Sequence, residues 1–229
     1  LNPGDEVILG DPSYEAFRDT VNVAGATPVM VPLDSEMKYD LDAMLAAITP
    51  KTKMVVVVNP NNPTGTYVDS SKVEAFVKAV PEHVLCVIDE AYLEFVSKPD
   101  TYSMIKLIKE GYEKPLLVLK TFSKAYGMAG LRIGVAAGNP DLISFLGKSG
   151  AAWNINFLGQ RMAAAALQDQ EYIKKIADLN AVERDKLTAE LTALGCKVYE
   201  SQTNFILFKA PKLENTEIYA KLAEQKVLI

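Results

Sequence analysis

The chain has 229 residues, of which 49% are hydrophobic and 23% charged, a composition that can bury a substantial core and is typical of a globular protein. Its 24 Lys and Arg residues against 29 Asp and Glu residues give a net charge of -5, without the basic surface that nucleic-acid binding requires. No apolar stretch approaches the roughly 18 residues of a membrane span, and the first residues do not form a signal peptide, so we expect a cytoplasmic protein with no nucleic-acid or membrane partner.

Short apolar runs alternate with amphipathic segments along most of the chain. The expected strands are residues 7–10, 28–33, 54–58, 85–89, 116–121 and 133–137, and the expected helices are residues 14–24, 41–47, 70–80, 103–110 and 141–148. Several strands are apolar at consecutive positions, as is required of a strand covered on both faces. The alternation predicts an α/β fold in which a doubly wound, mostly parallel sheet lies between helices. Ligands of such folds bind at the carboxyl ends of the strands.

The pattern changes in the last third of the chain. A long helical stretch is expected at residues 158–194, then strands at 197–199 and 205–208 and a helix at 216–226. We place a domain boundary near residue 175, so that residues 1–175 form a large domain and residues 176–229 part of a smaller α+β domain. The chain begins in a turn without an initiator Met and stops in an apolar segment, and we interpret it as a fragment lacking both ends.

Histidine and cysteine are too scarce for two common kinds of catalytic site. His83 is the only histidine, and Cys86 and Cys196 lie far apart in the sequence. We therefore expect neither a serine-hydrolase triad nor a metal site. Any chemistry must depend on other side chains.

Three polar clusters follow predicted strands. Asn-Pro-Asn-Asn-Pro-Thr-Gly occupies residues 59–65, Asp-Glu-Ala-Tyr residues 89–92, and Lys-Thr-Phe-Ser-Lys-Ala-Tyr-Gly residues 120–127, with Arg132 shortly after. Taken singly, the first is a rigid turn, the second a helix cap and Lys124 a surface lysine. Their position at the ends of parallel strands predicts instead that they meet at one edge of the sheet.

Together, the motifs resemble those of fold-type I pyridoxal-phosphate enzymes of the class I/II aminotransferase group, and most closely histidinol-phosphate aminotransferases. The resemblance runs over essentially the whole chain, through residues 3–7, 61–65, 89–95 and 123–132. It implies pyridoxal 5'-phosphate as the cofactor, a small-molecule amino donor and a 2-oxo acid as substrates, and a homodimer. The implied reaction, in histidine biosynthesis, transfers an amino group between L-histidinol phosphate and 2-oxoglutarate.

The resemblance also implies roles for individual residues. Lys124 would carry the cofactor as a Schiff base and then move the proton during catalysis. Asp89 would pair with the pyridine nitrogen and keep it protonated, so that the ring accepts electrons. Asn62 and Tyr92 would hydrogen-bond the phenolate oxygen, and Tyr14 would stack on the ring, unless it is a core residue.

The phosphate would be held by two hydroxyl groups and a guanidinium group, those of Thr121, Ser123 and Arg132. Thr121 has the alternative of being only a strand-end residue. The family also implies a phosphate-binding helix start before Pro3, an N-terminal arm, and an arginine for the substrate carboxylate just beyond Ile229, none of which this sequence contains.

Two asparagines are weaker candidates for contacts with the substrate. Asn204 would orient the substrate carboxylate or the arginine that binds it, or else is a polar residue at a strand edge. Asn154 follows Trp153, and this segment would approach the site of a partner subunit, with core packing as the alternative for Trp153.

Other functional classes fit the sequence less well. A P-loop nucleotide hydrolase would need a glycine where Leu142 precedes Gly147-Lys148-Ser149, and no G-x-G-x-x-G motif for a dinucleotide is present. The non-enzyme alternative is a pyridoxal-phosphate-fold sensor domain of a transcription regulator. Within the enzymes, an aromatic or broad-specificity aminotransferase and a threonine-phosphate decarboxylase relative share the same cofactor residues.

Overall fold

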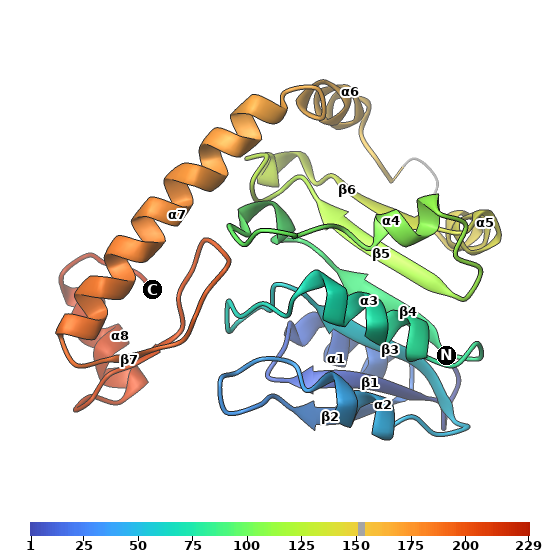
Figure 1. Cartoon of the computed structure of the whole chain (residues 1–229), viewed down its shortest axis with the longest axis horizontal. Helices are drawn as coiled ribbons and strands as arrows, with labels where there is room; N and C mark the ends of the chain where they lie inside the picture. Colours follow the sequence, from blue (N-terminus) through green and yellow to red (C-terminus); the bar gives the residue numbers. More distant parts are fainter. Residues whose placement is uncertain (151–153) are drawn as a thin grey trace.

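The computed structural model describes residues 1–150 and 154–229. Figure 1 shows a larger unit built on a central sheet, from which one long helix leads to a smaller C-terminal unit. The strands are β1 (Glu6–Asp11), β2 (Thr27–Pro32), β3 (Thr52–Val58), β4 (Leu85–Asp89), β5 (Leu116–Thr121), β6 (Gly134–Gly138), β7 (Lys197–Val198) and β8 (Phe208–Lys209). The helices are α1 (Glu15–Val23), α2 (Leu41–Ala46), α3 (Ser70–Ala79), α4 (Ile105–Lys109), α5 (Pro140–Ser149), α6 (Phe157–Ala166), α7 (Gln170–Ala193) and α8 (Asn215–Glu224), with short 3₁₀ turns η1 (Leu93–Phe95) and η2 (Ala129–Leu131).

The six strands of the large sheet lie in the order β2-β1-β3-β4-β5-β6. All neighbouring pairs from β2 to β5 are parallel, and only β6 runs antiparallel to β5. A parallel return would need a crossover helix, whereas residues 122–133 contain only loop and the 3₁₀ turn η2. The predicted doubly wound, mostly parallel α/β sheet is confirmed. The order in which successive strands are added to the sheet reverses between β1 and β3, and such a switch point opens a crevice at the carboxyl ends of the strands.

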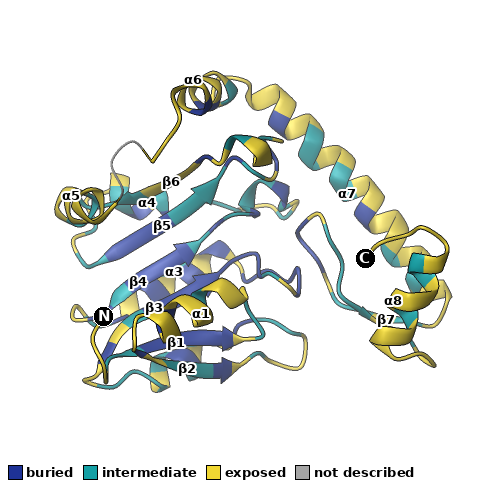
Figure 2. Cartoon of the chain, turned by 180° about the vertical axis from the view of Figure 1, so that it is seen from behind, coloured by how far each residue is buried: buried dark blue, intermediate teal, exposed yellow. Residues whose placement is uncertain are grey.

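Helices cover both faces of this sheet. Figures 1 and 2, which view the chain from opposite sides, show α2, α3 and α4 on one face and α1 on the other. The residues between the layers form one continuous core, in which Val55 to Val58 of β3 are all at most 2% exposed. Each fully buried valine contributes about 1.5–3 kcal/mol to folding, so the central strands are fixed firmly.

The long helical stretch expected at residues 158–194 is two helices in the structure. α6 ends at Ala166, and α7 starts at Gln170 because the Asp169 side chain accepts a hydrogen bond from the Tyr172 N–H and caps a new helix. α7 runs without interruption through residue 175, and the domain boundary there stays a prediction. In the described parts of the chain, no helix combines the length and apolar character needed to cross a membrane.

The C-terminal unit contains the expected short strands and helix, but residues 205–208 form less strand than predicted. β8 contains only Phe208 and Lys209, paired antiparallel with β7. The Phe205 carbonyl oxygen is taken by the hydroxyl groups of Ser201 and Thr203 instead of a strand partner. These local bonds keep residues 201–205 as a loop that reaches back towards the large sheet (Figure 1).

A buried arginine on α7 joins this returning loop to the large unit. The Arg184 guanidinium group donates to the Ser97 hydroxyl at 2.9 Å and to the backbone oxygens of Thr203 and Phe95 at 3.2 and 3.4 Å. Gln202 extends the same contact, because its Oε1 accepts a hydrogen bond from the Ser97 N–H at 2.9 Å. Burial lowers the pKa of Arg184 from its ordinary value.

A second contact of this loop reaches the turn that follows β3. The Gln202 N–H donates to the Gly65 oxygen at 2.8 Å. Gly65 has φ +76°, and a Cβ there would lie 2.6 Å from Ser201 Oγ. Both the backbone conformation and the close approach therefore require glycine at this position.

Replacing Arg184 with Met should destabilise the complete protein by about 2–4 kcal/mol, because the change removes the hydrogen bonds to the Phe95 oxygen and the Ser97 hydroxyl and leaves the Thr203 oxygen with only its bond from Asn180. The matched control is Arg161→Met on an exposed position of α6, for which we expect a change within about 0.5 kcal/mol. Urea denaturation followed by circular dichroism measures both. Equal midpoints for the two variants would contradict this role of Arg184.

Candidate active site

A cavity of about 330 Å³ opens at the carboxyl edge of the large sheet. Its lining comes from segments at or after the ends of β1, β3, β4 and β5: Tyr14, Val58, Asn62, Asp89, Ala91, Tyr92, Leu119, Lys120, Thr121, Ser123, Lys124, Ala129 and Arg132. All eight cofactor-binding residues expected from the sequence lie in this lining. A larger hollow of about 620 Å³ beside α2 and α3 contains none of them.

The register of the central strands determines which residues form the floor of this cavity. Val58 of β3 is the partner of Asp89 of β4, and Asp89 is the partner of Leu119 of β5. These three residues therefore form one row across the ends of the central strands. The Asp89 carboxylate is half-buried and stands between two apolar neighbours.

The loop between β5 and β6 carries Lys124. Ser123 donates its N–H to Thr121 Oγ1 at 3.1 Å, and Gly127, at φ +68°, donates its N–H to the Lys124 oxygen at 2.9 Å. Phe122 is buried beneath the loop against Ile133, and the Met128 N–H bonds the Phe122 oxygen at 2.9 Å. The anchored loop leaves Lys124 exposed above the cavity, with Nζ 5.1 Å from the centre of the Tyr92 ring.

Asp89 is the last residue of β4, and Tyr92 follows it after a tight turn. Asp89 Oδ1 accepts a hydrogen bond from the Ala91 N–H at 3.0 Å. Burial raises the pKa of Asp89, and the Ala91 bond and the charge of Lys124 oppose that shift. Tyr92 is 5% exposed and packs edge-on against Phe205 of the returning loop, with ring centres 5.1 Å apart. The C-terminal unit thus helps to fix the Tyr92 ring.

Arg132 lies near the end of the loop between β5 and β6 and has a left-handed backbone conformation, with φ 54° and ψ 51°. This conformation costs a residue with a side chain about 1–2 kcal/mol, and it turns the chain from η2 into β6. Arg132 Nη1 donates to the Ala129 oxygen at 2.7 Å. The rest of this exposed guanidinium group remains available to an anion in the cavity.

Tyr14 and Asn62 come from the turns that follow β1 and β3, and buried Asn61 joins the two turns. The Asn61 amide nitrogen donates to the Pro12 oxygen at 3.1 Å, and its Oδ1 accepts from the Tyr39 hydroxyl at 3.4 Å. Burial raises the pKa of Tyr39 to about 12 against the opposing bonds from Ser13 and Val58. Its phenol is therefore protonated at neutral pH and can donate to Asn61.

The two candidate substrate residues do not reach this cavity. Asn204 is exposed and lines a separate hollow of about 270 Å³ beside α7, with Asn180 and Arg184 among its neighbours. Asn154 is exposed as well and is not part of the lining. Trp153, expected to pack in the core or to approach a partner's site, lies outside the described residues.

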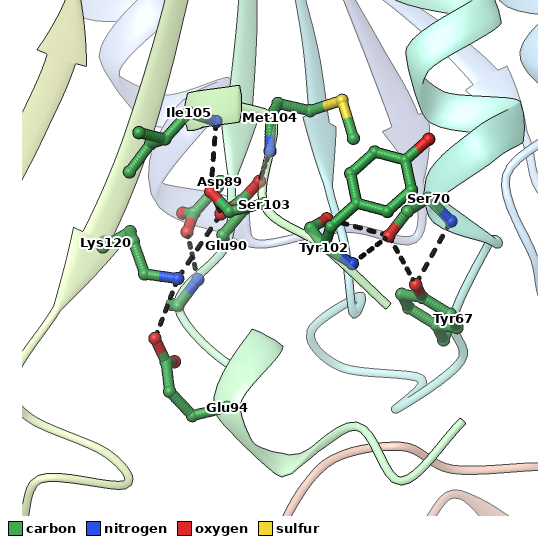
Figure 3. A network of polar contacts seen from close by, with 11 residues as sticks. Tyr67, Ser70, Asp89, Glu90, Glu94, Tyr102, Ser103, Met104, Ile105 and Lys120 are labelled. Atoms are coloured by element: carbon green, nitrogen blue, oxygen red, sulfur yellow. Dashed lines mark hydrogen bonds and ion pairs between the residues drawn. The ribbon is translucent and has the colours of Figure 1, made fainter. Parts of the chain in front are cut away.

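Three charged residues next to the cavity were not identified as site residues from the sequence. Figure 3 shows Lys120 of β5 between Glu90 and Glu94, with Nζ 3.4 Å from Glu90 Oε2 and 2.8 Å from Glu94 Oε1. Glu90 is only 2% exposed and also accepts hydrogen bonds from the Ser103 hydroxyl and the Met104 N–H. The sequence feature that could have identified this cluster is Glu90, a second carboxylate directly after Asp89 at the end of a buried strand.

Comparisons with known proteins identify relatives of this chain. The histidinol-phosphate aminotransferase of Moorella thermoacetica is 36% identical over 100% of this chain and 58% of its own length. An aromatic amino acid aminotransferase of Mycobacterium sp. strain KMS is 41% identical over 99% of this chain and 62% of its own length. The crystal structure of histidinol-phosphate aminotransferase from Sinorhizobium meliloti in complex with pyridoxal-5'-phosphate superposes with a TM-score of 0.89 at 30% identity, covering 100% of this chain and 62% of that one.

The chain thus spans about three fifths of the length of these relatives. Residues 1–229 match the family described as aminotransferase class I and II, whose members use pyridoxal phosphate. A match over the entire chain, on a fold whose strand ends hold the expected lysine, aspartate and arginine in one cavity, identifies the family: this chain belongs to the class I and II aminotransferases.

Proposed function

We propose that the complete protein containing this chain is a pyridoxal-phosphate-dependent aminotransferase, and that it acts on L-histidinol phosphate with 2-oxoglutarate as the acceptor, in histidine biosynthesis. The observation that carries the cofactor assignment is the convergence of Lys124, Asp89, Tyr92 and Arg132 on one cavity of about 330 Å³. That volume lies within the roughly 300–1,000 Å³ of small-molecule sites.

The chemistry of the lining suits pyridoxal phosphate. Thr121, Ser123 and Arg132 provide two hydroxyl groups and a guanidinium fork for a phosphate dianion. Asp89 is a desolvated carboxylate whose raised pKa would be lowered by a cation, and a protonated pyridine nitrogen is such a cation. Tyr14 is 48% exposed at the mouth of the cavity, where its ring is accessible for stacking.

When bound, the cofactor supplies an electron-withdrawing ring that accepts charge from the substrate α-carbon and stores the amino group between two half-reactions. Lys124 would hold it covalently and, once released, would take the proton from the substrate α-carbon. Asp89 would keep the pyridine nitrogen protonated. Asn62 and Tyr92 would donate hydrogen bonds to the phenolate oxygen and orient the ring.

The choice of substrate rests on similarity, and three candidates compete. The Moorella thermoacetica relative carries the name histidinol-phosphate aminotransferase at 36% identity, and the resemblance through residues 89–95 and 123–132 favours it. The relatives named aromatic amino acid aminotransferase are 41–43% identical, so an aromatic amino donor is the second candidate. A threonine-phosphate decarboxylase activity is the third.

A homodimer is part of the proposal. Large apolar side chains are exposed on α5 and α6, among them Phe145 at 66%, Phe157 at 73% and Leu158 at 61%. Exposed apolar surface of this extent favours association. Size-exclusion chromatography with light scattering of the complete protein would measure the assembly.

Lys124→Ala should abolish nearly all amino transfer, because Lys120, the other lysine of the lining, is ion-paired with Glu90 and Glu94 and cannot take over both the covalent bond and the proton transfer. In the unmutated protein, borohydride reduction followed by peptide mapping should place the cofactor on Lys124. Lys148→Ala, at an exposed position of α5, is the control and should retain activity. A cofactor label on any other lysine of the unmutated protein would overturn the assignment.

Asp89→Asn should retain cofactor bound through Lys124 but slow removal of the substrate α-proton by on the order of 10² or more, since the amide cannot stabilise a protonated ring nitrogen. Stopped-flow absorbance in a single half-reaction measures this step. Asp141→Asn, on an exposed position of α5, is the control. Near-normal rates for Asp89→Asn would assign this role to a different group.

The pyridoxal form of the complete enzyme, mixed with single amino donors, should convert to the pyridoxamine form fastest with L-histidinol phosphate. Rates for phenylalanine, tyrosine and aspartate provide the comparison, and 2-oxoglutarate should restore the starting form. A clear preference for phenylalanine or tyrosine would establish the aromatic candidate instead. Release of carbon dioxide from a phosphorylated amino acid would indicate the decarboxylase.

A further inference from the structure

The two strands beside the switch point of the large sheet separate before they reach the carboxyl edge. β1 pairs with β3 only as far as Ile8 and Val55. Beyond these residues β1 continues beside β2 to Asp11, and β3 continues beside β4 to Val58. Within residues 1–150 and 154–229, the last part of each strand therefore has no strand partner on the side that faces the other strand.

The side chain of Tyr39 fills this separation. Tyr39 belongs to the loop between β2 and α2 and is 6% exposed. Its ring lies against the backbone of β1, since a Cβ at Gly10 would overlap Cε1 of the ring and stand 2.9 Å from its Cζ. Its hydroxyl group reaches β3, where it accepts a hydrogen bond from the Val58 N–H at 3.3 Å. Glycine at residue 10 therefore admits the aromatic ring between the two strands.

The Val58 N–H depends on this phenol for an acceptor. The next amide along the chain, that of Asn59, donates to the Asp89 oxygen of β4 at 2.8 Å. Successive N–H groups of a strand point to opposite neighbours, so the Val58 N–H points towards β1, which has already turned away. Tyr39 thus replaces the acceptor that a strand would otherwise provide to a buried amide.

Three hydrogen bonds use the full capacity of the Tyr39 hydroxyl group. The Asn61 amide nitrogen donates to two oxygens, those of Pro12 and of the Thr64 hydroxyl. Its Oδ1 therefore faces Tyr39 and accepts the phenol proton at 3.4 Å. Ser13 Oγ, 2.6 Å from the phenol oxygen, then donates its own proton to that oxygen.

The directions of these bonds do not change near neutral pH. Burial raises the pKa of Tyr39 to about 12, and the charge of Asp89 adds to this rise, against the opposing bonds from Ser13 and Val58. The phenol therefore keeps its proton and remains the donor to Asn61.

The two side chains bonded to the phenol directly precede residues of the cavity lining. Ser13 comes before Tyr14, and Asn61 comes before Asn62. Tyr39 itself is not part of the lining. Its hydroxyl group thus holds the turns after β1 and β3 at a fixed separation from behind the cavity.

We propose that Tyr39 is a positioning residue for the cofactor, whose hydroxyl group sets Tyr14 against the ring and Asn62 at the phenolate oxygen, an inference that rests on the proposed function. A tyrosine that only packs between the strands would need its ring but not its hydroxyl group. Lys124 attaches the cofactor from a different loop, so loss of the Tyr39 hydroxyl group should leave attachment intact and loosen the orientation of the ring.

Tyr39→Phe in the complete protein, loaded with pyridoxal phosphate, tests this role. Absorbance between pH 5 and pH 10 follows the pKa of the Lys124 Schiff base, and titration with cofactor gives its Kd. A donor at the phenolate oxygen favours the deprotonated Schiff base, in which the phenolate charge has lost its internal partner. Weaker donation from Asn62 should therefore raise the Schiff-base pKa by about half a unit to one unit. The Kd should rise about three- to tenfold.

Tyr102→Phe is the matched control. The pKa of Tyr102 is also raised to about 12, and its hydroxyl group donates to Glu74 at 2.7 Å, but Tyr102 is not part of the cavity lining. This variant should leave the Schiff-base pKa and the Kd unchanged. Circular dichroism confirms that each variant is folded.

Ser13→Ala is a second, smaller change, which keeps the Tyr39 hydroxyl group and its bond to Val58. It should shift the Schiff-base pKa in the same direction as Tyr39→Phe. The double variant should shift it no further than Tyr39→Phe alone, because both changes remove the same hydrogen bond.

A folded Tyr39→Phe variant whose Schiff-base pKa and Kd match those of Tyr102→Phe would overturn the inference. If Tyr39→Phe does not fold, the same result for Ser13→Ala would do so. The unmutated protein distinguishes this failure from failure of the proposed function. Borohydride label on Lys124 there leaves the proposed function standing, whereas no cofactor absorbance at all contradicts the proposed function and this inference together.

Discussion

The parallel register of β3, β4 and β5 is the constraint on which the site depends. Buried consecutive valines fix β3 in the sheet, and hydrogen bonding then sets Val58, Asp89 and Leu119 in one row at the carboxyl edge. A slip of one residue would move Asp89 out of that row and turn its side chain to the other face. Because the chains of β3, β4 and β5 all leave the sheet at this edge, their following turns must surround the same space, and the cavity forms there.

Polar contacts from outside the sheet hold this arrangement together. Asn61 joins the turns that carry Tyr14 and Asn62, and Arg184 joins the segment after η1 to the returning loop of the C-terminal unit. That loop brings Phe205 against Tyr92. The C-terminal unit therefore contributes to the geometry of the cavity without being part of its lining.

The parts of the fold that could be predicted from the sequence are those that follow from local patterns. Residues 85–89 and 116–121 were expected as strands and coincide with β4 and β5, because runs of consecutive apolar residues are a strong signal. The break between α6 and α7 was missed although Asp169 offered a cap. The direction of β6 and the position of Asn204 depend on how distant segments pack, which periodicity does not encode.

The same distinction applies to the cavity. Its eight expected residues were named from the family resemblance, and most of them lie in or beside clusters at strand ends, which the fold class brings together. Asn61, Glu90 and Glu94 were not identified, since their partners Pro12, Ser103 and Lys120 are distant in sequence and only the folded chain pairs them.

The central claim, that these strand ends bind pyridoxal phosphate in one defined orientation, is tested most directly by a crystal structure of the complete protein with the cofactor. We expect electron density continuous with Lys124 Nζ, the pyridine nitrogen within hydrogen-bond distance of Asp89, and the phosphate at Ser123 and Arg132. A cofactor bound outside this cavity, or with its phosphate at Asp89, would contradict the claim.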